Sequence, residues 1–120
     1  MKNKIISVTV GLPVTDLDRA IDWYRQLLGE LEEINPVEGV WEICVTPSFT
    51  LQLFAMESEE SSSKSVGFET SNIERSHELT LSLGVKVGEI ETVPEAVHYF
   101  EFSDPYGNLL SFYQLVDNNA

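Results

Sequence analysis

Cysteine, basic side chains and long apolar runs are all scarce in this sequence, and each shortage excludes a class of protein. The single cysteine, Cys44, rules out a disulfide within the chain and favours a reducing compartment. Only 7 Lys and Arg residues stand against 20 Asp and Glu residues, which gives a formal net charge of −13. Nucleic acids and anionic membrane surfaces attract basic footprints, so neither is an expected partner.

The sequence also lacks the segments that direct a chain into or across a membrane. No apolar run approaches the roughly 20 residues of a transmembrane helix. The opening residues MKNKIISVTVGLPVTD contain neither the apolar core nor the small-residue cleavage site of a signal peptide. Together with the lone cysteine, these shortages predict a cytoplasmic protein.

What is present begins with a strand followed by an amphipathic helix. Residues Ile5–Val14 are β-branched and alternate in polarity, which predicts a strand. Thr15 or Asp16 is placed to cap a helix that runs to Gly29, a typical C-terminal glycine. Further strands are expected at Gly29–Ile34, Val40–Val45 and Phe49–Ala55.

The same order of elements returns after the polar, serine-rich segment Met56–Ser65, which has the composition of a linker. Ser65–Gly84 resembles Thr9–Gly29, and the spacing Ser71-x-x-Glu74 predicts a capping box at the second helix. Strand candidates follow at Val85–Val93, Ala96–Phe102 and Asn108–Val116, the last aligned with Phe49–Ala55 so that Ser111 corresponds to Gln52. The alternative is a chance similarity between two amphipathic strand–helix segments.

A βαβββ unit repeated twice predicts an α+β fold in one domain. Its modules would span residues 5–56 and 65–116. One helix can cover only one face of a four-stranded sheet, so each module keeps an open face. We therefore expect a curled mixed sheet whose open faces surround a shared cleft.

Two motifs add a resemblance to a known family. The opening PVTDLDRAIDWYRQLLG, the closing DPYGNLLSFY and the internal repeat together resemble the vicinal oxygen chelate superfamily. That superfamily contains glyoxalase I, bleomycin-resistance proteins, fosfomycin-resistance enzymes and ring-cleaving dioxygenases. The resemblance covers nearly the whole chain and implies two modules around a cleft, usually in a homodimer.

The resemblance also implies where a divalent metal would be held, and those positions carry unusual residues. Members with chemistry use mostly His and Glu, one from the first and one from the last strand of each module. The corresponding positions here are Thr9, Gln52, Ser65 and Ser111. Neutral hydroxyls and a single amide are weak ligands for a cation. We therefore expect no metal and no cofactor, although Glu69, Glu101 or His98 remain alternatives for recruiting one.

Strand alternation then separates cleft-facing side chains from core side chains. The cleft set adds aromatic and acidic residues to the four positions above: Phe54, Glu69, Tyr99, Glu101 and Tyr113. The opposite set is uniformly apolar and is expected beneath the helices: Val8, Val10, Leu12, Leu51, Leu53, Val66, Phe68, Leu110 and Phe112. Along Trp41–Val45, apolar residues alternate with Glu42 and Cys44. This pattern alone does not show which of the two sets faces the cleft. His77 is expected to be exposed, and His98 to be a partly buried structural residue.

Three functions fit this cleft. The first is a metal-independent small-molecule-binding protein, similar to bleomycin-resistance proteins, that sequesters a basic or aromatic compound. The second is a glyoxalase-like isomerase or lyase that uses Glu69, Glu101 or an atypical metal. The third is a scaffold in which Phe54, Tyr99 and Tyr113 simply fill the cleft or pack at a dimer interface.

Overall fold

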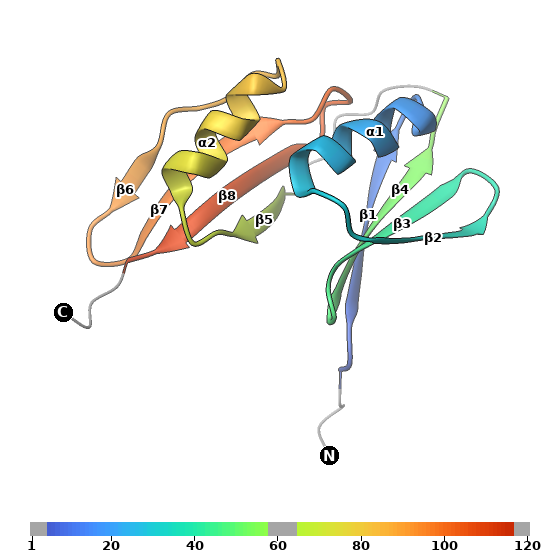
Figure 1. The fold of residues 1–120 in the computed structure, drawn as a ribbon, viewed down its shortest axis with the longest axis horizontal. Coiled ribbons are helices and arrows are strands. Elements are labelled where there is room, and N and C mark those ends of the chain that lie inside the picture. The colour runs from blue at the N-terminus through green and yellow to red at the C-terminus, as the bar shows by residue number, and fades with distance from the viewer. Residues whose placement is uncertain (1–4, 58–64, 117–120) are drawn as a thin grey trace. The chain divides into compact units, whose positions relative to one another are not determined.

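The computed structural model describes residues 5–57 and 65–116, and the chain divides into two compact units, Met1–Glu60 and Ser61–Ala120. Residues 58–64, the middle of the expected linker, lie outside the described residues. The first unit contains β1 (Val8–Val14), α1 (Leu17–Leu28), β2 (Glu32–Val37), β3 (Val40–Thr46) and β4 (Phe49–Ala55). The second contains β5 (Ser65–Glu69), α2 (Ile73–Ser82), β6 (Glu91–Val93), β7 (Val97–Ser103) and β8 (Leu109–Leu115) (Figure 1).

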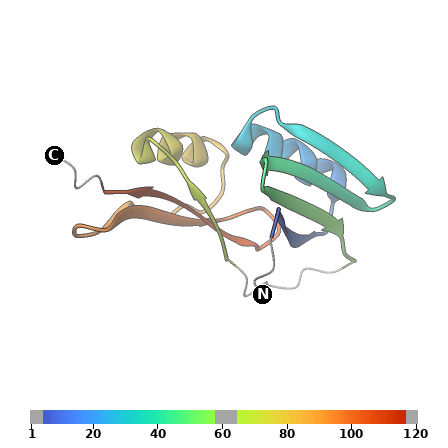
Figure 2. The same ribbon diagram turned by 90° about the horizontal axis from the view of Figure 1, so that it is seen from below.

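Each unit is one mixed sheet with a helix over one face (Figures 1 and 2). The strand order is β1-β4-β3-β2 in the first unit and β5-β8-β7-β6 in the second. The pairs β1–β4 and β5–β8 are parallel, and the other pairs are antiparallel. The predicted α+β fold of two βαβββ modules is therefore confirmed.

The strand register is the same in the two units. Gly11 lies opposite Gln52 in the first unit, and Gly67 lies opposite Ser111 in the second. The predicted correspondence of Gln52 with Ser111 is thus confirmed at the level of individual residue pairs.

The covered faces form two cores of different composition. The first packs aliphatic side chains from its strands against α1: Leu12, Ile43, Leu51 and Leu53 with Ala20, Ile21, Tyr24 and Leu27. The second is an aromatic cluster in which Phe112 lies 5.5 to 5.6 Å, between ring centroids, from Phe68, Phe100 and Phe102. The prediction that Val8 belongs to the core is wrong, because Val8 lies at the start of its strand and is 50% exposed.

Local side-chain chemistry determines where both helices begin. Asp16 caps α1 by accepting a hydrogen bond from the Arg19 amide at 3.2 Å. In α2 the cap is Asn72, which accepts from the Arg75 amide at 3.1 Å. The predicted capping box at Ser71 is therefore wrong by one residue. Within the described ranges, neither helix has the length and hydropathy that a membrane crossing requires.

The connection from α2 to β7 differs most from the sequence-based expectation. Only Glu91–Val93 of the predicted strand Val85–Val93 forms β6, and Val87 adds an isolated bridge to Phe102. The ring nitrogen Nε2 of His77 hydrogen-bonds the carbonyl oxygen of Gly88 at 2.9 Å. The same ring packs edge-on against Phe100, with 4.7 Å between centroids. His77 is therefore partly buried, and its predicted exposure is wrong.

Strand boundaries in the first unit also shift from the expected ones. β1 begins at Val8 rather than Ile5, and β2 spans Glu32–Val37 rather than Gly29–Ile34. Gly29 has φ of 86°, a left-handed conformation that ends α1 and delays the start of the next strand.

An arginine connects α1 to β2 in the first unit. The guanidinium of Arg25 donates to both oxygens of Glu33, with a shortest distance of 2.7 Å. Trp41 donates its indole N–H to the same carboxylate at 2.9 Å. The hydrogen bonds from Arg25, against the opposing effect of burial, hold the pKa of Glu33 below its usual value.

The turn between β7 and β8 is buried and built around Asp104. Its carboxylate accepts hydrogen bonds from the backbone amides of Tyr106 and Asn108 at 2.8 and 2.9 Å. It also accepts from the side-chain amide of Asn108 at 2.7 Å. Gly107 has φ of 85°, which explains the glycine in the predicted turn.

Candidate functional site

The nine predicted site residues lie on strand positions that alternate with the core side chains, so they belong to the open faces of the sheets. The first unit carries Thr9, Gln52 and Phe54. The second carries Ser65, Glu69, Tyr99, Glu101, Ser111 and Tyr113. We describe the two faces separately.

The open face of the first unit combines an aromatic ring with polar side chains. Phe54 leans across β1 over Gly11, where a Cβ atom would come within 3.2 Å of the ring. Gln52 lies between Gly11 and Glu42 in the sheet, and its side-chain amide donates to the Glu42 carboxylate at 2.9 Å. The one acidic group at the centre of this face is therefore already partnered.

Glu42 is a site residue that the sequence reasoning left unassigned. It lies opposite Gln52, just as Glu101 lies opposite Ser111. Aligning the third strands of the two modules, as was done for the fourth strands, would have identified Glu42. Strand alternation then assigns Cys44 to the same open face.

The open face of the second unit is acidic and carries two tyrosines. One row across the sheet contains the strand neighbours Glu69, Tyr113, Tyr99 and Glu91. Its neighbouring row contains Gly67, Ser111 and Glu101. Tyr113 leans over Gly67, where a Cβ atom would lie 3.5 Å from two ring carbons.

The hydroxyl of Tyr99 responds to the acidic groups around it. A hydrogen bond to Glu91, together with the negative charge of that carboxylate, raises the pKa of Tyr99. Glu101 acts in the same direction more weakly. The two carboxylates therefore oppose ionisation of the Tyr99 hydroxyl.

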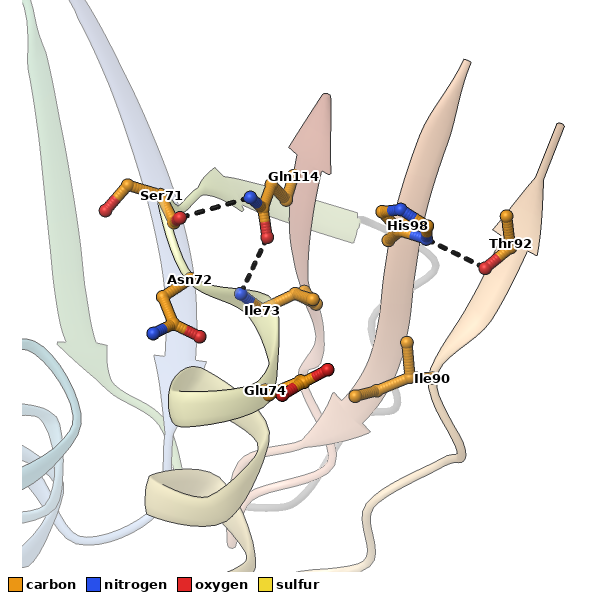
Figure 3. Close-up of a pocket in the computed structure, with 8 residues that line it drawn as sticks. All are labelled: Ser71, Asn72, Ile73, Glu74, Ile90, Thr92, His98 and Gln114. Carbon is orange, nitrogen blue, oxygen red and sulfur yellow. Dashed lines mark hydrogen bonds between the residues drawn. The ribbon is translucent and has the colours of Figure 1, made fainter. Parts of the chain in front are cut away.

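A hollow lies on the helix-covered side of the second unit, away from the nine predicted residues. It has a volume of about 520 Å³ and lies beside the start of α2 (Figure 3). Gln114 crosses it, accepting from the Ile73 amide at 2.9 Å and donating to the Ser71 carbonyl at 3.1 Å. His98 pairs through Nδ1 with the Thr92 hydroxyl at 2.8 Å. His98 is partly buried, as predicted, and these polar groups already serve the fold.

Comparison with family models identifies the chain. The model of the glyoxalase/bleomycin resistance protein/dioxygenase superfamily matches residues 6–112. The chain belongs to this superfamily. A search of curated protein sequences finds no match.

Solved structures of the superfamily share the fold at low sequence identity. A glyoxalase/bleomycin resistance protein from Catenulispora acidiphila has a TM-score of 0.75 at 20% identity, covering 92% of this chain and 99% of its own. An antibiotic-binding protein from a Streptomyces species has a TM-score of 0.74 at 21% identity, covering 92% and 95%. The fosfomycin resistance protein FosX from Listeria monocytogenes has a TM-score of 0.77 at 16% identity, covering 95% and 94%. Another structure of FosX holds Mn(II) and a sulfate ion.

The four positions that the sequence resemblance assigns to metal ligands carry residues that do not suit a divalent cation. Thr9 and Gln52 are diagonal neighbours on one open face, and Ser65 and Ser111 have the same relation on the other. All four are uncharged, whereas such sites use carboxylate, imidazole or thiolate ligands. Across residues 5–57 and 65–116, no three His, Cys, Asp or Glu side chains are grouped so as to hold a metal ion.

Proposed function

We propose that this superfamily member binds a small organic molecule, basic or aromatic, without a metal ion, through the open faces of its sheets. The observation that carries the proposal is the pairing of aromatic rings with uncharged groups where metal ligands are expected. Phe54 and Tyr113 lean over glycines beside Gln52 and Ser111. Ligand sites commonly combine apolar walls with a few placed polar groups.

The glycines support a binding role because the backbone does not require them. Gly11 and Gly67 lie inside strands and are not among the glycines with positive φ. Glycine weakens a strand interior and often marks a close approach of another group. In both units that group is an aromatic ring on the open face.

A thermal-shift screen tests the proposal with aromatic amines, neutral aromatic compounds and divalent metal salts. We expect saturable stabilisation by organic compounds and none by metals. The double variant Phe54→Leu/Tyr113→Leu should lose the shift, whereas Leu79→Ala, an exposed change on α2, should retain it. Metal analysis of protein purified without chelator or affinity tag should find no stoichiometric metal, and finding one held by Thr9, Gln52, Ser65 and Ser111 would contradict the proposal.

An isomerase or lyase is the second candidate, and the state of two carboxylates favours it. Among the described residues, the carboxylates of Glu69 and Glu101 have no hydrogen bond or ion pair, so either is open to contact with a substrate. An activity with a pH–rate profile that Glu69→Gln or Glu101→Gln abolishes would establish this alternative. Binding without turnover would support the first proposal instead.

We also expect the protein to act as a cytoplasmic homodimer. Side chains such as Ile34 and Val37 on β2, and Leu115 on β8, are 44 to 60% exposed and offer apolar surface for a second copy. Light scattering coupled to gel filtration measures the mass directly. A monomer at all concentrations would contradict the dimer without affecting the binding proposal.

A further inference from the structure

We propose that the open face of the second unit binds the organic ammonium group of a ligand, held between the ring of Tyr113 and the carboxylate of Glu69. This inference rests on the proposed small-molecule function and assigns the positive end of the ligand to one unit. Tyr113 and Glu69 are direct neighbours on the parallel strands β8 and β5. A cation above an aromatic ring and beside a carboxylate is attracted by both.

The orientation of Tyr113 is the first observation behind the inference. A Cβ atom at Gly67 would lie 3.5 Å from both Cδ1 and Cε1 of Tyr113 and 3.2 Å from the Ser111 hydroxyl oxygen. The edge of the Tyr113 ring therefore lies against β5 beside Gly67, on the same open face as Glu69. The π face of an aromatic ring attracts cations.

The carboxylate of Glu69 is the second observation. Glu91 is the cross-strand neighbour of Tyr99 and raises the pKa of its hydroxyl, and Glu101 lines a hollow of about 300 Å³ together with Lys86. The carboxylate of Glu69 has no hydrogen bond or ion pair in the part of the chain that the structure describes, and its cross-strand neighbour is Tyr113. It is therefore the carboxylate on this face best placed to pair with an incoming cation.

The absence of positive charge from these strands is the third observation. The sequences of β5, β6, β7 and β8 contain no Lys or Arg. A ligand ammonium group at Tyr113 thus has no competing side chain from the sheet itself. The first unit offers no equivalent site, because its leaning ring neighbours Pro13 where the second unit has Glu69.

Choline is a suitable probe, with its tert-butyl analogue, in which carbon replaces the charged nitrogen, as the control ligand. NMR titration of the whole protein should show choline shifting the Tyr113 ring and the amides of β5 and β8. We expect the neutral analogue to bind at least about fivefold more weakly. Equal binding of the two would overturn the inference.

Matched variants localise the effect. Tyr113→Leu and Glu69→Gln should each weaken choline binding about fivefold or more, while Tyr113→Phe should retain it. The controls Leu79→Ala and Glu78→Gln on α2 should change it less than about twofold. Amide spectra and thermal midpoints show whether each variant is folded.

The outcome separates this inference from the function on which it rests. If neutral aromatic compounds stabilise the protein and choline does not bind, the ammonium site is wrong and small-molecule binding stands. If neither binds, both proposals fail. If Glu78→Gln weakens choline as much as Glu69→Gln does, the attraction is a general effect of net charge and the site is overturned.

Discussion

The two units of this protein have the same register in their parallel strand pairs and differ in the side chains around them. In each, a glycine on the first strand lies beneath an aromatic ring from the fourth: Gly11 with Phe54, and Gly67 with Tyr113. The neighbours of those rings differ. The acid at the centre of the first face, Glu42, is bonded to Gln52, whereas the second face carries Glu69 and Glu101 without such partners among the described residues.

The comparison shows that a repeated fold conserves geometry more readily than chemistry. Backbone pairing determines which positions are adjacent, and in the parallel pairs β1–β4 and β5–β8 it is the same in the two units. The side chains at those positions are free to differ, because an open face does not need to fill a core. The two sheets therefore provide one surface whose central carboxylate is bonded to an amide and one whose carboxylates lie beside tyrosines.

The largest expected effect compares the two cores. Phe112→Ala should lower the free energy of unfolding by about 4 kcal/mol, because it removes the ring at the centre of the aromatic cluster. The corresponding change in the aliphatic core, Leu53→Ala, should cost about 3 kcal/mol. Urea denaturation followed by circular dichroism measures both. A cost below about 1 kcal/mol for Phe112→Ala would show that the cluster does not support the second unit.

The second-largest effect compares the stability contributed by the turn that precedes the last strand of each unit. Asp104→Ala should cost about 3 kcal/mol, because it leaves buried amides of Tyr106 and Asn108 without their acceptor. In the first unit the matching turn is exposed, with Thr46 accepting one hydrogen bond from Ser48 at 3.3 Å. Thr46→Ala should therefore cost no more than about 0.5 kcal/mol. Equal losses of unfolding free energy for Asp104→Ala and Thr46→Ala, measured by urea denaturation, would refute this prediction.

The ion pair of the first unit should give it a distinct pH dependence. The pKa of Glu33 is lowered in the folded chain, so its contribution is present above the usual glutamate pKa of about 4.3 and is lost as the pH falls through the folded value. At neutral pH, Glu33→Gln should cost about 1 kcal/mol, because Arg25 is 44% exposed and solvent screens the pair.

Stability measured from neutral to acid pH tests this assignment. The difference between the wild-type protein and Glu33→Gln should shrink as the pH falls below about 4. Glu30→Gln, an exposed change in the same unit, should show no such difference. If the stability difference between the wild-type protein and Glu33→Gln persists at acid pH, the charge of the Glu33 carboxylate is not the source of the stabilisation.

The smallest effect concerns Tyr99 on the acidic face. Glu91→Gln should lower the pKa of Tyr99 toward the usual value of about 10, because it removes the charge that opposes ionisation. The change should alter the free energy of unfolding by less than about 0.5 kcal/mol. NMR pH titration of the Tyr99 ring measures the shift, with Glu78→Gln as the control. An unchanged pKa would show that Glu91 does not contact the hydroxyl in solution.

Much of the fold could be predicted because its signals are local. Asp16 and Gly29 bound the first helix, and alternation of polarity separates most core positions from open ones. The errors arose where a nearby residue competed or a distant strand intervened. Asn72 replaced Ser71 as the cap, and His77 became partly buried because the segment around Gly88 packs beside it.

The sequence by itself determined the repeat, the limits of the first helix and the uncharged residues at the four positions that the resemblance assigns to metal ligands. Tertiary structure alone decided which side chains became neighbours across strands. It paired Glu42 with Gln52, placed Tyr113 over Gly67 and left Glu69 beside that ring. The physical reason is that cross-strand neighbours depend on register between segments far apart in the chain, which no local pattern specifies.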